Sequence, residues 1–85
     1  MKPRPQLVVG SPYWSEAGAP VVPIIFGTTT IWFALENRLV DVKRDPPRAY
    51  VSDKIFKAMV RMAAAVLRDF ADRNPNLCTA PGPGP

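Results

Sequence analysis

Proline is the residue that most limits what this chain can fold into. Eleven of the 85 residues are proline, and with five glycines they gather at the two ends of the chain and at a central break. Proline fixes φ and lacks a backbone N–H, so it interrupts helices and sheet interiors. Roughly 65 residues are left to build a core, and a domain of that size buries only about 60% of its unfolded surface. We therefore expect one small domain that depends on a partner or on copies of itself.

The same punctuation divides the chain into three parts. Residues 1–5 form a basic, proline-rich arm, residues 6–73 a single small domain, and residues 74–85 a tail rich in proline and glycine. Inside the domain, the sequence RDPPR predicts a break at residues 45–48, because the residue before a proline avoids the α region. The two ends are expected to be extended and to lie along neighbouring chains.

Residues 52–73, SDKIFKAMVRMAAAVLRDFADR, predict an amphipathic helix. Ser52 is a good N-cap, Asp53 complements the helix dipole, and Pro75 prevents continuation. The apolar side chains cover an arc of about 160°, whereas a helix against one core needs about 100°. Either a small domain wraps its helix well or a second surface covers part of the arc. The second interpretation predicts a partner-binding face made of Ile55, Phe56, Met59, Met62, Val66 and Phe70.

The polar side of the same helix carries a cluster of positive charge. Lys54, Lys57, Arg61 and Arg68 fall within about 60° of one another at helical spacing. A charged stripe is most often solvated, but contact with the phosphates of a nucleic acid is the alternative that we retain. The net charge of +4 and the pI of about 9.7 permit an anionic partner.

The segment before the break is apolar and β-rich. QLVV, at residues 6–9, predicts a short strand closed by the turn residues GSP. VVPIIFGTTTIWFAL, at residues 21–35, has strand composition, with Pro23 expected at a strand start or edge and Gly27 at a bend or bulge. The uncharged window at residues 17–35 leaves a membrane span as a minor alternative, since a span needs about 20 predominantly apolar residues and this window is broken by two prolines.

Residues 28–44 allow two interpretations. As a hairpin with its turn at Glu36–Asn37, they place Phe33 opposite Val40 and Ile31 opposite Val42, with Trp32, Ala34 and Leu39 on the other face. As a helix, they place five apolar side chains on one stripe: Ile31, Trp32, Leu35, Leu39 and Val42. The β-branched and aromatic residues favour the hairpin. The expected fold is therefore α+β, a two- or three-stranded antiparallel sheet or hairpin packed on one C-terminal helix, with an all-α helical hairpin as the alternative.

Several classes of chemistry are missing from the sequence. There is no histidine, Cys78 is the only cysteine, and the seven acidic residues are scattered. No triad, Cys/His metal site or phosphate-binding loop can be assembled from this set, so we expect no enzyme, no cofactor, no metal and no small-molecule substrate.

We expect instead a non-enzymatic interaction or assembly subunit of a larger or homo-oligomeric complex, which binds another protein or copies of itself. A nucleic-acid-binding protein is the first alternative and a single-span membrane subunit the second. The N-terminus lacks the apolar run of a signal peptide, which predicts a cytoplasmic location or a place within a macromolecular assembly.

Overall fold

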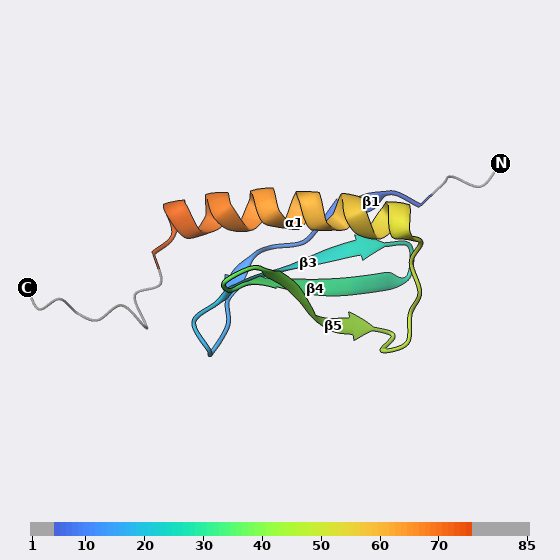
Figure 1. The fold of residues 1–85 in the computed structure, drawn as a ribbon, viewed down its shortest axis with the longest axis horizontal. Helices are drawn as coiled ribbons and strands as arrows, with labels where there is room; N and C mark the ends of the chain where they lie inside the picture. Colours follow the sequence, from blue (N-terminus) through green and yellow to red (C-terminus); the bar gives the residue numbers. More distant parts are fainter. Residues whose placement is uncertain (1–4, 76–85) are drawn as a thin grey trace, which may run out of the picture.

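A five-stranded antiparallel sheet and one long helix make up the structure, a computed structural model that describes residues 5–75. Figure 1 shows the helix lying along one side of the sheet. The elements in chain order are β1 (Leu7–Val9), β2 (Tyr13–Trp14), β3 (Pro20–Phe26), β4 (Thr29–Leu35), β5 (Leu39–Asp45) and α1 (Asp53–Arg73).

The α+β prediction is confirmed, but the two or three strands expected are too few. The all-α alternative is wrong, because residues 28–44 form most of β4 and β5 rather than a helix. The predicted proline-rich tail from residue 76 onward, and residues 1–4 of the predicted arm, lie outside the described residues.

The strands follow the order β1-β3-β4-β5, with β2 also paired to β3. β1 and β2 share one edge of β3, since Leu7–Val9 pairs with residues 24–26 and Tyr13–Trp14 with residues 20–21. β3 is therefore a central strand with β4 on its other side.

Pro23 lies inside this central strand rather than at a strand start or edge. It is opposite the gap between β1 and β2, and its carbonyl accepts a hydrogen bond from the Gly10 N–H at 2.8 Å. The carbonyl and the nitrogen of one strand residue point to the same side, so the missing N–H of Pro23 also faces the gap. The sheet thus tolerates a proline where no ladder bond to a neighbouring strand is needed.

The two hairpin turns differ in how well the sequence predicts them. Gly27, expected at a bend, has a positive φ of 62° in the tight turn between β3 and β4. The β4–β5 hairpin is confirmed, but its turn is one residue longer than predicted, because Leu35 pairs with Leu39 and residues 36–38 form the loop. Val40 therefore pairs with Ala34 rather than with Phe33. Such a shift moves side chains to the opposite face of the sheet.

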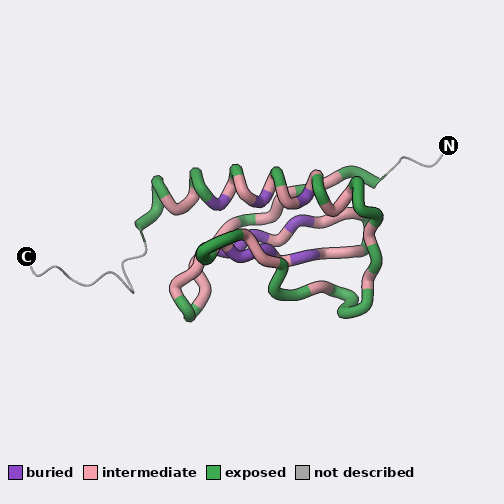
Figure 2. Tube along the Cα trace, in the orientation of Figure 1, coloured by how far each residue is buried: buried purple, intermediate pink, exposed green. Residues whose placement is uncertain are grey.

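The core lies between α1 and the sheet. Its fully or almost fully buried members are Val22, Ile24, Ile31, Phe33, Met59, Ala63 and Leu67. Figure 2 shows the buried positions gathered between these two layers. Burying one large apolar side chain contributes about 1.5–3 kcal/mol, and no polar or charged residue among the described positions is buried with them.

Both ends of α1 are fixed. At the start, the Ser52 hydroxyl accepts a hydrogen bond from the Ile55 N–H at 3.3 Å, which confirms the predicted N-cap. At the end, the Trp14 Nε1–H donates to the Asn74 carbonyl at 2.8 Å, and the Trp14 ring lies 5.5 Å from that of Phe70. The predicted helix at residues 52–73 is confirmed.

Within residues 5–75, no helix combines the length and the apolar character needed to cross a membrane. The window at residues 17–35, considered above as a span, lies mainly in β3 and β4.

Candidate functional site

The apolar arc of α1 packs against the sheet of the same chain. Met59 has no exposed surface, and the Phe56 ring lies 5.8 Å from the ring of Phe33. Ile55, Met62 and Val66 are partly buried and pack against the core cluster, and Phe70 packs on Trp14. The apolar arc of α1 thus packs against the sheet, where α1 contacts β1, β3 and β4. That another protein also contacts these six residues stays a prediction.

A second apolar surface lies on the opposite side of the sheet. Side chains alternate along a strand, so the residues between the core positions point away from α1. The strand register aligns them in three rows across the sheet. We call this surface the outer sheet face; its rows are Val8–Ile25–Thr30–Asp45, Pro23–Trp32–Lys43 and Tyr13–Val21–Ala34–Val40.

The outer sheet face is apolar in its middle and accessible at its margins. Val21 and Ala34 retain only 4% and 3% of their surface, whereas Val8 and Tyr13 expose 51% and 45%. Trp32, Pro23 and Ile25 are half-buried between them. The Lys43 ammonium stands 4.9 Å from the centre of the Trp32 ring, a cation–π contact, so the face carries charge only along β5.

No helix or strand within residues 5–75 covers the outer sheet face, because α1 lies wholly on the other side (Figure 1). A sheet with one solvated face normally places polar residues there. Here the positions on β1, β2, β3 and most of β4 are apolar instead. An uncovered apolar surface of this kind is typical of an interaction site.

The sequence contains a signal for this face, which lies in β3 and not in the periodicity of α1. β3 reads PVVPIIF, an uninterrupted apolar run, and such runs are typical of strands buried on both faces. One of the two faces of β3 is covered by α1, and the other belongs to the outer sheet face. The surplus apolar surface of the chain therefore lies on the sheet rather than on the helix.

The predicted anion-contact residues lie on the solvent side of α1. Lys54, Lys57, Arg61 and Arg68 are all exposed, and Lys57 forms an exposed ion pair with Asp53 at 3.2 Å. An exposed pair of this kind contributes about 0–1 kcal/mol. Lys57 and Arg61 also line a shallow hollow of about 460 Å³ whose apolar part is Phe56 and Val60.

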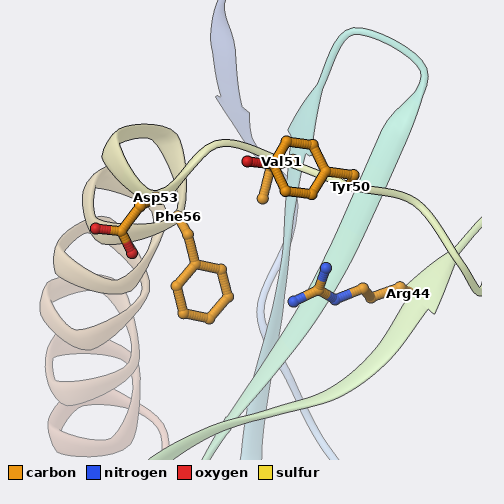
Figure 3. Close-up of a pocket in the computed structure, with 5 residues that line it drawn as sticks. All are labelled: Arg44, Tyr50, Val51, Asp53 and Phe56. Atoms are coloured by element: carbon orange, nitrogen blue, oxygen red, sulfur yellow. The ribbon is translucent and has the colours of Figure 1, made fainter.

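A second shallow hollow, of about 340 Å³, lies beside the first at the start of α1. Figure 3 shows Arg44 of β5 and Phe56 of α1 pointing toward one another below Tyr50. The Arg44 guanidinium carbon lies 5.6 Å from the centre of the Phe56 ring, and the same guanidinium pairs with Asp41 at 3.2 Å and donates to the Ala49 carbonyl at 3.0 Å. Arg44 is thus used by the fold, and it fixes the linker that leads into α1.

The described residues contain no group of three or more histidine, cysteine, aspartate or glutamate side chains placed to hold a metal ion. Comparison with protein-family models, with curated proteins and with solved structures gives no match to this chain. The geometry of the outer sheet face and of the basic residues on α1 is therefore the basis for assigning a role.

Proposed function

We propose that this protein is a non-enzymatic interaction or assembly subunit that binds a protein partner through the outer sheet face. The observation that carries the proposal is an apolar sheet face on which no helix of residues 5–75 packs, with Trp32 half-buried and Val8 and Tyr13 more than two-fifths exposed at its margin. Removing apolar surface from water is favourable by about 25 cal/mol for each Å² buried, and the entropic cost of association opposes this gain. The partner is another protein or a further copy of the chain.

The test is a comparison of partner capture by matched variants of the full chain. Val8→Lys and Val40→Lys each place a charge on the outer sheet face, at opposite sides of the sheet. Tyr50→Lys adds the same kind of charge at a residue that is 84% exposed and lies on the linker before α1. We expect both face variants to lose bound proteins that the native chain and Tyr50→Lys retain. Equal recovery of the same proteins by all four chains would contradict the proposal.

Nucleic-acid binding is a second candidate, favoured by the exposure of the basic row on α1. Lys54, Lys57, Arg61 and Arg68 face solvent on the side of the molecule away from the outer sheet face. The two roles therefore do not compete for one surface. Each phosphate neutralised on a duplex lowers the slope of log K against log salt by about 0.9.

Replacing Lys57, Arg61 and Arg68 together by Ala tests this candidate. If the basic row binds phosphates, the triple variant binds DNA or RNA more weakly and its salt slope is smaller by about two to three. Unchanged affinity and slope in a fluorescence anisotropy titration would eliminate it. The variant Val8→Lys serves as the control, since it raises the net charge without touching the basic row.

A further inference from the structure

We infer that the occupant of the outer sheet face is a second copy of this chain, so that two sheets pack face to face with the helices outside. This inference rests on the proposed function, because it names the partner for the same surface. The resulting dimer has four layers, α1–sheet–sheet–α1, related by a two-fold axis. An interface of this kind uses one patch twice and must be complementary to itself.

The area of the face is what a small dimer requires. A seven-residue strand spans about 23 Å, and four strands about 4.8 Å apart span nearly 20 Å. Two such faces bury on the order of 1,000 Å² in total, which is the lower limit for a specific interface. The expected dimer is therefore weak, with a Kd in the micromolar range rather than the nanomolar range.

The charge on the face fits a copy of itself. Among its residues only Lys43 and Asp45 carry charge, one of each sign, and both lie on β5. The face is thus neutral, although the whole chain has a net charge of +4. A strongly acidic partner would find a single cation there, and that cation already contacts Trp32.

The basic residues of α1 do not oppose this arrangement. Lys54, Lys57, Arg61 and Arg68 are exposed on the helix layer, which becomes the outer surface of each protomer. Two sheets and two helices then separate the basic rows by more than the Debye length of about 8 Å at physiological salt, so their repulsion is largely screened.

Pairing of two β5 edges is the competing way to join copies, and β5 is poorly suited to it. The strand carries a bulge, where Val42 has no partner between the Trp32–Lys43 and Phe33–Asp41 pairs. Bulges and charged side chains such as Lys43 are the features by which natural edge strands avoid pairing with other chains. Face-to-face packing leaves this edge free.

Sedimentation velocity on the full chain, from about 1 to 300 µM, tests the inference at the concentrations where a weak dimer forms. We expect the native chain and Tyr50→Lys to show the same monomer–dimer equilibrium, and Val8→Lys and Val40→Lys to raise its Kd at least tenfold. Circular dichroism of each variant serves as the control that its fold is retained. With the native chain alone, NMR amide signals of β1, β3 and β4 are expected to shift with concentration, while those around Arg61 and Arg68 stay constant.

Three outcomes overturn the inference: a native chain that stays monomeric throughout, a dimer indifferent to both face variants, or dimerisation only after residues 76–85 are deleted. The last would identify the tail as the occupant of the face. A monomeric native chain whose partner capture is still lost in Val8→Lys would leave the proposed function standing without a second copy. Equal capture by all variants would reject the proposed function itself.

Discussion

At the scale of single residues, the contact between Gly10 and Pro23 holds the broken edge of the sheet together. A Cβ added to Gly10 would lie 2.6 Å from Pro23 Cγ and 3.2 Å from the Pro23 carbonyl oxygen. Gly10→Ala must therefore separate β1 from β3 at this point or distort the proline ring. Overpacking of this kind costs about 1–3 kcal/mol, so we expect a loss of that size in the free energy of unfolding measured in urea.

The matched control is the same substitution in a chain that already carries Pro23→Ala, in which the clashing Cγ is absent. The cost of Gly10→Ala should be smaller in that background, since residues in direct contact are not energetically independent. Identical costs in the two backgrounds would mean that the ring is not what requires glycine at position 10.

At the scale of the elements, the apolar arc of α1 has a buried centre and margins that are only partly buried. Met59 is fully buried in the core cluster, whereas Met62 is only partly buried beside that cluster. Met59→Ala should lower the free energy of unfolding by about 2–5 kcal/mol. Met62→Ala removes the same atoms from a partly exposed position and should cost less, as thermal or chemical denaturation of the two variants can measure.

The prediction is tested by which of the two variants loses more stability, and Met59→Ala is expected to lose more than Met62→Ala. If Met62→Ala were as destabilising as Met59→Ala in the isolated chain at low concentration, Met59 would not be more deeply buried than Met62, which would contradict the structure. If it weakened partner capture without changing stability, the helix arc would share in partner binding, as the sequence pattern predicted.

The helix and the hairpin show where sequence patterns are sufficient and where they are not. α1 could be predicted to within a residue, because its cap, its stop at Pro75 and its apolar period are all local features. The hairpin could be predicted only as a hairpin. Its register depends on which face of β5 turns toward the core, and Leu39 rather than Val40 packs against the core cluster. That choice is made by tertiary packing, which overrides the local turn preference.

The candidate site was harder to predict for a related reason. The sequence predicts a partner-binding face that includes Met59 and Val66, because the apolar residues of an amphipathic helix repeat with a clear period. That period does not show whether the apolar arc of the helix is covered by the sheet of the same chain or by a partner. The outer sheet face is assembled from four separate segments, so its members become neighbours only after the strands pair. Val8 and Ile25, for example, are opposite one another in the register but far apart in sequence.

At the scale of the whole molecule, the two-layer architecture leaves one face of the sheet, the outer sheet face, without a helix packed on it. Apart from Pro20, only nine apolar residues of the described part are buried, and two of these, Val21 and Ala34, belong to the outer sheet face rather than to the core between α1 and the sheet. A fold with so few buried side chains is marginal on its own. Association through the outer sheet face would add to its stability by mass action.

Stability should therefore depend on protein concentration. Raising the concentration from well below the dimer Kd to about a hundredfold above it should stabilise each protomer by on the order of 1–2 kcal/mol. For a domain of this size, that change raises Tm by about 4–16 °C. Val8→Lys should match the native Tm in dilute solution, because an exposed surface substitution changes stability by about 0.5 kcal/mol or less. It should then fail to gain Tm as its concentration rises, whereas Tyr50→Lys should gain as the native chain does. A native Tm that is constant over this range in differential scanning calorimetry would show that each protomer reaches its full stability with the outer sheet face uncovered.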